Sequence, residues 1–351
     1  MGLLLPPHRP GLRLLFALPR SGGPPCRRPR SPGRYVIEAA VTPETLRLGG
    51  KTAISRALAR AEVPDPGTEV TDLLDRAWQQ PQAHVIGLTG PPGVGKSSLL
   101  DVMIRDYRAL GKTVGVVVID PSSKLSGGAL LGDRIRLRLD PEDDGVFVRS
   151  LSAGDRLGGL SVATFPVVAL MRSLFDIVLV ETVGVGQSES DVIGIADTVL
   201  LCIQPASGDS LQFIKSGLVE LPHILVINKA DMTIEARRAK ADAEGALSVT
   251  GNRRGGWQTG IVSVSARART GLTELNAAID RHAGWLASGS RLQQGRDEQA
   301  KAWLQDTVRD AFGKRGLADL PELTAERLKA PFRTRHCLCN PSSGTHNGPS
   351  R

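Results

Sequence analysis

The amino-acid sequence predicts an α/β fold: a doubly wound, mostly parallel β-sheet with helical extensions at its N-terminal and C-terminal ends. Two observations support this prediction. Between residues 84 and 287, short apolar runs alternate with longer amphipathic stretches, and a glycine-rich loop joins the first run to the first stretch. The runs are rich in Val and Ile, as in strands that helices cover on both faces. The expected strands are residues 84–89, 113–119, 145–150, 177–180, 198–203, 224–227 and 261–264.

The stretches between these runs carry apolar residues at helical spacing. They predict helices at residues 97–110, 161–174, 209–220, 234–247 and 272–286. Two further helices are expected before the sheet, at 42–60 and 70–80, because Thr42 is a good cap and a Pro/Gly break separates the two stretches. After the sheet, residues 291–312 predict a polar helix with one apolar side.

Composition excludes several classes of protein. Hydrophobic residues make up 41% and charged residues 23% of the 351 residues, as in ordinary globular proteins. Aromatic residues are only 4%, and much of the net charge of +8 comes from seven arginines in the first 37 residues, so no nucleic-acid partner is expected. No apolar run approaches the roughly 18 residues of a membrane span, so no membrane partner is expected either. The four cysteines do not form a disulfide framework, which favours a reducing compartment.

The first 40 residues have two explanations. Their basic, acid-free beginning resembles a mitochondrial presequence, but eight prolines would break the amphipathic helix that such a signal uses. We expect a disordered tail or an over-called start site, and therefore a cytoplasmic protein, with the mitochondrial matrix as the alternative location.

The glycine-rich loop is the first motif that predicts chemistry. Residues 90–97 read Gly-Pro-Pro-Gly-Val-Gly-Lys-Ser, which matches the P-loop pattern G-x-x-x-x-G-K-[ST], and they lie between an expected strand and an expected helix. Backbone N–H groups of such a loop surround phosphates, Lys96 would reach the outer phosphates, and Ser97 would bind Mg²⁺. The expected nucleotide contacts here are Gly90, Gly93, Val94, Gly95, Lys96, Ser97 and Ser98.

A second motif predicts the base. Asn228-Lys229-Ala-Asp231 follows an expected strand and matches the guanine-reading pattern N-K-x-D. The Asp231 carboxylate can accept hydrogen bonds from N1–H and the exocyclic amine of guanine, a donor pair that adenine lacks. Ser265-Ala266 follows the last expected strand, where a short backbone contact to the base is common among GTPases.

Three acids lie at or just after strand ends: Asp120, Asp133 and Glu181. Carboxylates at this edge of a parallel sheet point into the ligand crevice and can hold Mg²⁺ together with Ser97, although any one of them could instead cap a helix or pair with an arginine. Gly184 lies three residues after Glu181 and could donate its N–H to the γ-phosphate. No finger arginine can be assigned, so slow intrinsic hydrolysis is expected.

These motifs divide the chain into five expected parts. They are a disordered basic tail at 1–40, an N-terminal helical extension at 41–83, a P-loop GTPase domain at 84–287, a C-terminal helical arm at 288–330 and a disordered tail at 331–351.

Three longer blocks carry a family resemblance. They are Asp-Pro-Ser-Ser-Lys-Leu-Ser-Gly-Gly from Asp120, Glu-Thr-Val-Gly-Val-Gly-Gln-Ser-Glu from Glu181, and Gly-Asp-Ser-Leu-Gln-Phe-Ile-Lys from Gly208. These blocks resemble the MeaB/ArgK-type (MMAA-like) G-protein chaperones, which serve adenosylcobalamin-dependent methylmalonyl-CoA mutase. The resemblance extends from about residue 46 to about residue 303.

The resemblance implies that the P-loop, the three acids and the guanine loop bind GTP or GDP with Mg²⁺. It implies catalytic roles for Lys96 and Glu181, and for Gln212 and Lys215 in an extra switch that responds to the partner enzyme. The implied partners are methylmalonyl-CoA mutase, or a related adenosylcobalamin-dependent mutase, and a second copy in a homodimer.

Two departures from the family pattern put parts of this reading in question. Gly154-Asp155-Arg156 stands where the family has Arg-Gly-His, which affects the first-switch contacts, and the C-terminal arm is shortened, which affects dimerisation. The alternatives are a metal-inserting GTPase of the hydrogenase or urease maturation type, which would need a His-rich or Cys/His site, and a P-loop small-molecule kinase, against which Asp231 argues.

Overall fold

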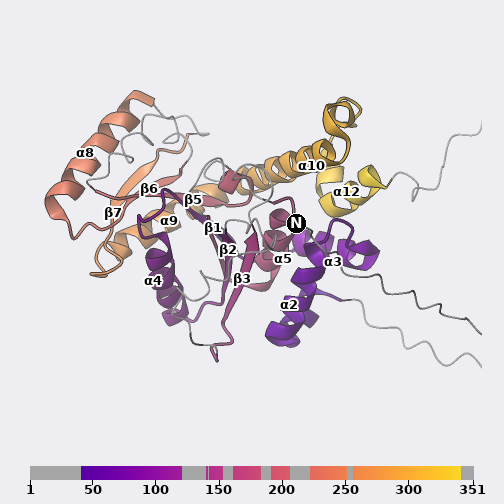
Figure 1. Ribbon diagram of the computed structural model, residues 1–351, viewed down its shortest axis with the longest axis horizontal. Helices are drawn as coiled ribbons and strands as arrows, with labels where there is room; N and C mark the ends of the chain where they lie inside the picture. Colours follow the sequence, from indigo (N-terminus) through magenta and orange to yellow (C-terminus); the bar gives the residue numbers. More distant parts are fainter. Residues whose placement is uncertain are drawn as a thin grey trace, which may run out of the picture. The chain divides into compact units, whose positions relative to one another are not determined.

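The computed structural model describes residues 41–120, 140, 142–152, 161–182, 191–205, 222–250 and 256–340. In these residues, seven parallel strands form one sheet in the order β3-β2-β4-β1-β5-β6-β7 (Figure 1). This confirms the predicted α/β class, and each strand lies within two residues of its expected place. The strands are β1 His84–Thr89, β2 Val114–Asp120, β3 Val146–Ser152, β4 Ile177–Glu181, β5 Thr198–Ile203, β6 Ile224–Ile227 and β7 Gly260–Ser263.

Helices cover both faces of the sheet. Successive strand residues point to opposite faces, so the apolar residues of one strand pack against helices on both sides. Ile86 and Leu88 of β1 pack in one core cluster with α4 (Lys96–Ala109) and α9 (Leu272–Ala287). Val85, the residue before Ile86, points to the opposite face and belongs to a second cluster with α5 (Thr164–Leu174). A smaller cluster lies between β6 and α8 (Thr233–Thr250). The helix expected at 209–220 lies outside the described residues.

The N-terminal extension consists of α1 (Pro43–Leu48), α2 (Gly50–Ala61) and α3 (Gly67–Gln79), which pack against α5. The prediction of a single helix at 42–60 is wrong, because the helical conformation is interrupted between α1 and α2. Gly50 adopts a φ of +65°, a left-handed conformation that a helix interior does not contain. Thr42 caps α1 as expected, since its hydroxyl accepts a hydrogen bond from the Thr45 N–H at 3.3 Å.

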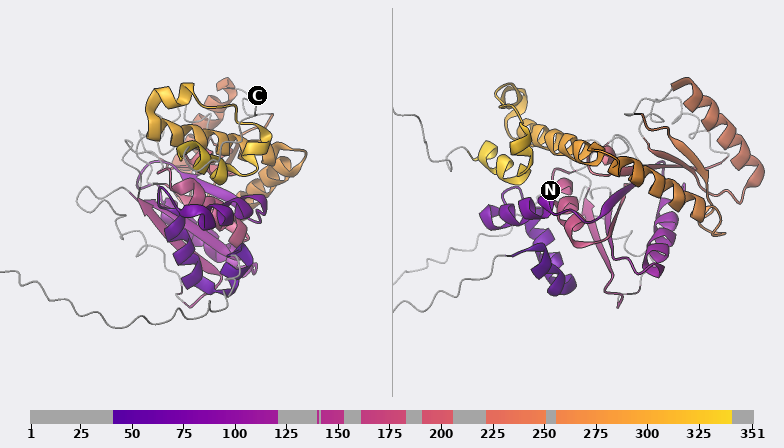
Figure 2. Two further views of the ribbon diagram at one scale, coloured as in Figure 1. Left: turned by 90° about the vertical axis from the view of Figure 1, so that its right-hand side faces the viewer. Right: turned by 180° about the vertical axis from the view of Figure 1, so that it is seen from behind.

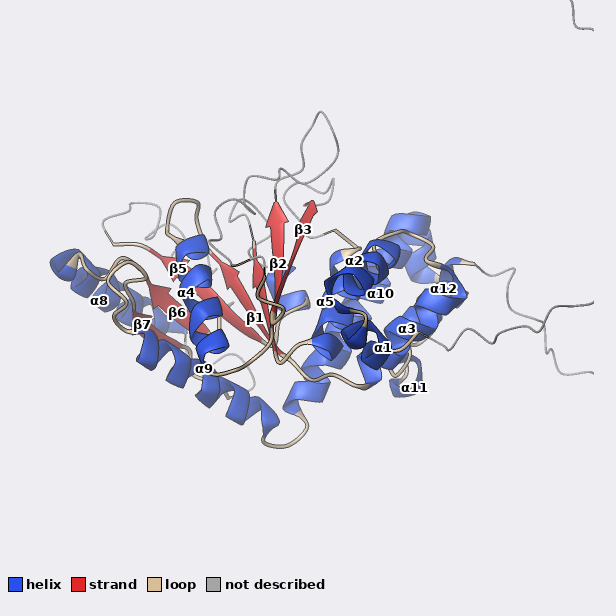
Figure 3. Cartoon of the chain, turned by 90° about the horizontal axis from the view of Figure 1, so that it is seen from below, coloured by secondary structure: helices blue, strands red, loops and turns tan. Residues whose placement is uncertain are grey.

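The C-terminal part contains α10 (Arg291–Ala318), α11 (Ala325–Leu328) and α12 (Pro331–Cys339), and α10 is kinked at Gly313, where φ is 66°. Figure 2 shows α10 leading away from the sheet toward α12, and Figure 3 shows these helices grouped with α1, α2 and α3. No helix in the described ranges combines the length and the apolar character that crossing a bilayer requires.

The α12 helix corrects the expectation of a tail that begins at residue 331. Phe332 is buried, and the backbone N–H groups of Phe332 and Arg333 donate to the two carboxylate oxygens of Asp75 at 3.0 and 3.1 Å. The Phe165 ring lies 5.9 Å from that of Phe332 and 4.8 Å from that of Trp303. A cap and an aromatic cluster supplied by distant residues therefore fold a segment whose composition alone predicts disorder.

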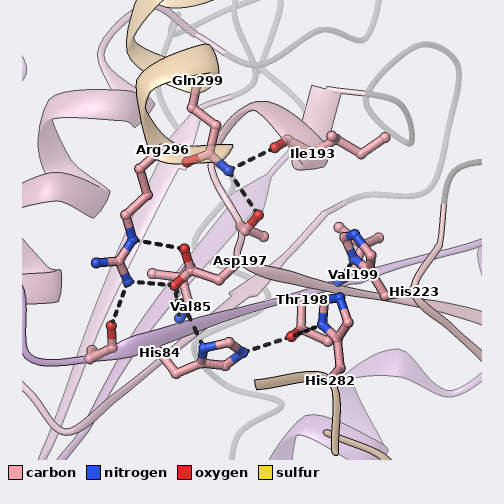
Figure 4. Close-up of polar contacts among 12 residues, drawn as sticks. His84, Val85, Ile193, Asp197, Thr198, Val199, His223, His282, Arg296 and Gln299 are labelled. Carbon is pink, nitrogen blue, oxygen red and sulfur yellow. Dashed lines mark hydrogen bonds and ion pairs between the residues drawn. The ribbon is translucent and has the colours of Figure 1, made fainter. Parts of the chain in front are cut away.

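A buried polar network lies at the edge of the sheet where β1 and β5 begin (Figure 4). The Thr198 hydroxyl is within hydrogen-bond distance of His84 Nε2, at 2.6 Å, and of His282 Nδ1, at 2.7 Å. Asp197, the residue before β5, forms an ion pair with Arg296 of α10. Because parallel strands all begin at this edge, the network is separated from the opposite edge, where the predicted nucleotide loops lie.

Candidate nucleotide site

The P-loop connects β1 to α4 at the carboxyl edge of the sheet. Gly90, Gly93 and Gly95 have φ values of 134°, 79° and 90°, and the backbone of a residue with a side chain would be strained at such positive values. A Cβ on Gly90 would lie 2.1 Å from the backbone oxygen of Cys202, and one on Gly95 would lie 2.6 Å from the Asn228 side-chain nitrogen. Two of the three glycines are thus required both by backbone conformation and by the approach of neighbouring strands and loops.

Lys96 is the first residue of α4, and only 6% of it is exposed. Its ammonium donates hydrogen bonds to the backbone oxygens of Gly90, at 2.7 Å, and Pro91, at 3.1 Å. The Lys96 ammonium therefore lies against the P-loop, as the sequence motif predicts. Burial raises the pKa of the Cys202 thiol, which underlies this loop, to about 12, so Cys202 is a packing residue here.

Ser97 and Glu181 come together across the same edge. The Ser97 hydroxyl donates to a carboxylate oxygen of Glu181 at 2.7 Å, and Glu181 is 6% exposed at the end of β4. Asp120 ends β2, which pairs with β4 so that Val118 lies opposite Glu181. A hydroxyl and a carboxylate in contact at a helix N-terminus are a donor set that suits a hard divalent cation such as Mg²⁺.

Asn228 joins the guanine loop to the P-loop. Its side-chain nitrogen donates to the backbone oxygens of Val94, at 2.9 Å, and Gly95, at 3.2 Å. Its side-chain oxygen accepts from the Ala266 N–H at 3.4 Å, so the third predicted loop is held by the same residue. The three motifs that the sequence placed far apart therefore meet around one buried amide.

Asp231, the residue predicted to read the base, is paired with Ser265. The Ser265 hydroxyl donates to a carboxylate oxygen of Asp231 at 2.6 Å and accepts from the Ala268 N–H at 3.0 Å. That hydroxyl bond is the main cause that lowers the pKa of Asp231. Asp231 is thus held as a carboxylate, the form that accepts hydrogen bonds from a purine, and Ser265 orients it, a role that the sequence motif did not indicate.

Lys229 has a positive φ of 57°, which is uncommon for a residue other than glycine. Its ammonium donates to the backbone oxygen of Gly93 at 2.7 Å and to the side-chain oxygen of Gln204 at 2.5 Å. Sequence reasoning missed Gln204, because an isolated glutamine after a strand carries no motif.

Several predicted residues lie outside the described part of the chain. They are Asp133, Gly184, Gln212, Lys215 and the segment Gly154-Asp155-Arg156. The described residues include no group of three or more His, Cys, Asp or Glu side chains arranged to hold a metal ion.

Comparisons with known proteins agree with this geometry. The family model described as "Methylmalonyl Co-A mutase-associated GTPase MeaB" matches residues 54–319. A protein of Pyrococcus horikoshii is 36% identical over 283 residues, which cover 80% of this chain and 88% of that protein. The GTPase ArgK of Escherichia coli is 34% identical over 271 residues, covering 74% of this chain and 80% of ArgK.

Two further similarities extend the comparison. The mitochondrial methylmalonic aciduria type A homolog of Mus musculus is 34% identical over 234 residues, covering 66% of this chain and 56% of the mouse protein. The crystal structure of an LAO/AO transport system kinase superimposes with a TM-score of 0.62 at 28% identity, covering 78% of this chain and 85% of that one.

Proposed function

Because the chain belongs to the MeaB family of methylmalonyl-CoA mutase-associated GTPases, we propose that it is a G-protein chaperone that uses GTP hydrolysis to gate adenosylcobalamin delivery to methylmalonyl-CoA mutase and to protect that enzyme. The observation that carries the nucleotide-binding part of the proposal is the meeting of three loops at Asn228, which contacts Val94 and Gly95 of the P-loop and Ala266 beyond β7. The choice of client is supported by the family match. The chain is a GTPase, and the client mutase is the proposed part.

The geometry supports a division of work within the nucleotide site. The P-loop residues 90–98 would hold the phosphates through backbone N–H groups, with Lys96 as their buried cation. Asp231, oriented by Ser265, would accept hydrogen bonds from guanine, and rejection of adenine would follow because a carboxylate would be left unpaired.

Magnesium fits the residues at the carboxyl edge. Ser97 and Glu181 would hold it, since their oxygens already lie 2.7 Å apart, and Asp120 and Asp133 are further proposed ligands. When bound, the cation supplies positive charge that offsets the charge of the phosphate oxygens. The contribution of the protein is to keep Lys96 and the Glu181 carboxylate at fixed positions beside the phosphates.

Hydrolysis on its own should be slow, because no finger arginine is assigned. Gln212 and Lys215 stand three residues apart in the block that resembles the partner-responsive switch of the family. We propose that Lys215 supplies positive charge at the γ-phosphate when the mutase is bound, in place of an arginine finger, and that Gly184 contacts the same phosphate.

We further propose that residues 84–287 form the GTPase domain, that residues 41–83 and 288–339 are helical extensions, the second of which includes α12, and that the protein acts as a homodimer. The proposed location is the cytoplasm, with the mitochondrial matrix as the alternative.

The test is GTP hydrolysis by the full chain with and without purified methylmalonyl-CoA mutase. We expect a slow basal rate that the mutase raises, and in Lys215→Ala we expect the basal rate and GTP affinity to be kept while most of the stimulation is lost. Lys240→Ala, at an exposed position of α8, is the matched control. Absence of stimulation in the parent protein would point to another client, and full stimulation of Lys215→Ala would remove Lys215 from the mechanism.

A further inference from the structure

We infer that Gln204 is a positioning residue for guanine recognition. It fixes the side chain of Lys229, and Lys229 in turn sets the spacing between the guanine loop and the P-loop. This inference rests on the proposed binding of guanine nucleotides and assigns a part of that site that no sequence motif marks.

The first step is the contact itself. Lys229 Nζ donates to Gln204 Oε1 at 2.5 Å and to the Gly93 backbone oxygen at 2.7 Å. The three groups come from different segments: Gln204 directly follows β5, Lys229 lies two residues after β6, and Gly93 lies in the P-loop. One ammonium group therefore connects the loops after β1, β5 and β6.

The second step is the backbone of the guanine loop. Lys229 holds a left-handed φ of 57°, and such conformations persist in residues with a side chain only where neighbours fix them. The preceding residue is fixed by the same stretch as Gln204, since the Asn228 N–H donates to the Ile203 backbone oxygen at 2.9 Å. Ile203 thus holds Asn228 through its backbone oxygen, and Gln204 holds Lys229 through its side-chain oxygen.

The third step is the chemistry of the acceptor. A hydrogen bond to an ammonium is charge-assisted and hence stronger than one between neutral groups. A glutamine oxygen accepts this bond without cancelling the charge, so the cation beside the phosphate loop is preserved. Asp231 follows two residues after Lys229, which means that a shift of Lys229 would move the carboxylate that reads the base.

The experiment compares the affinities of GDP and IDP for the full chain. Inosine lacks the exocyclic amine of guanine, so the ratio of the two affinities reports the position of Asp231 rather than overall folding. Gln204→Leu keeps the approximate volume and removes the acceptor, and Gln204→Glu keeps an acceptor for Lys229. Gln299→Leu is the matched control, because the Gln299 side chain donates to Ile193 and Ala196 backbone oxygens beside α10, away from the P-loop.

We expect Gln204→Leu to weaken GDP binding by about tenfold and to lower the GDP-to-IDP ratio by about fivefold, as for loss of one charge-assisted hydrogen bond. Gln204→Glu should keep the ratio of the parent protein, and Gln299→Leu should leave it unchanged. In a double-mutant cycle, Gln204→Leu should cost little more when Lys229→Met is already present.

Two results would overturn the inference: a parental ratio in Gln204→Leu, or strictly additive effects in the cycle. If Gln204→Leu fails to fold, Gln204→Ala in the same assay gives the same decision. Failure of the parent protein to bind GDP would instead reject the proposed function, so the two failures are distinguishable.

Discussion

Arg296 of α10 holds Asp197 through two hydrogen bonds, from Nε to Oδ1 at 3.0 Å and from Nη2 to Oδ2 at 2.8 Å. The same carboxylate accepts the backbone N–H of Val85 in β1 at 2.9 Å. The side chains of Arg296 and Asp197 are 8% and 1% exposed. Burial alone would raise the pKa of Asp197, but the hydrogen bonds from Arg296 together with the positive charges of Arg296, Arg172 and His84 outweigh it and lower the pKa to about 2. The pair therefore attaches α10 to β1 and β5 as a charged clamp.

Removing either partner of this clamp should leave a buried charge uncompensated. We expect Arg296→Leu and Asp197→Leu each to reduce the free energy of unfolding by about 3–5 kcal/mol, measured by denaturant titration at neutral pH. Arg60→Leu is the matched control, because Arg60 pairs with Glu69 at 2.6 Å but both side chains are more than half exposed, so about 1 kcal/mol or less is expected. Equal losses in the buried and the exposed pair would contradict the clamp.

A second prediction concerns how the stability of the protein depends on the pH through Asp75, the carboxyl that caps α12. Burial raises the pKa of Asp75 to about 6, even though the N–H groups of Phe332 and Arg333 oppose the shift. A carboxyl whose folded-state pKa is raised contributes stability below its ordinary pKa of 3.8, and this contribution is lost as the pH rises through about 6. Thermal unfolding between pH 4 and pH 8 should show this loss in the parent protein.

In Asp75→Asn this part of the pH dependence should disappear, since the amide does not titrate. Asp319→Asn, at an exposed position after α10, should keep the profile of the parent. An unchanged slope in Asp75→Asn would mean that another group titrates in this range.

Base selectivity should depend on Asp231. Asp231→Asn removes the carboxylate that Ser265 orients, and we expect GTP binding to weaken by about tenfold to a hundredfold. Binding of xanthosine triphosphate should improve, because the amide can donate to the oxygen that replaces the exocyclic amine of guanine. Competition binding of the two nucleotides measures the change in preference, with Asp242→Asn, at an exposed position of α8, as control. Unchanged preference would place the base elsewhere.

Phosphate binding should depend on Lys96 and Ser97. Lys96→Ala removes the buried cation and Ser97→Ala removes the hydroxyl that contacts Glu181, so each should lower the GTP hydrolysis rate by about a hundredfold or more. The rate is measured with saturating Mg²⁺ and GTP, and Ser248→Ala, on α8, should hydrolyse at the parental rate. Parental activity in either P-loop variant would reject the assigned site.

The sequence predicted the sheet well, because strands buried on both faces carry continuous apolar runs that cannot easily be mistaken for solvated loops. The P-loop and guanine-loop motifs were recognisable for another reason: the residue types and the spacing within each motif suit the phosphates and the base that they are proposed to bind. Gln204 was not predictable, because its role depends on Lys229, which lies 25 residues away in the chain. The helix at Phe332 was missed for a similar reason. It is stabilised by contacts with Phe165 and Asp75, which are distant in the sequence and which the local composition does not reveal.

The pairing of α3 with α12 has a consequence for synthesis on the ribosome. The Trp78 indole donates to the Leu328 backbone oxygen across 250 residues of sequence, and Asp75 accepts from Phe332 across 257. At translation rates of about 5–20 residues per second, α3 would wait roughly 10–50 s for its partner. During that time the aromatic ring of Trp78 lacks part of its final cover, so the nascent chain should be most prone to aggregation, and most dependent on general folding factors, until residue 333 has left the exit tunnel.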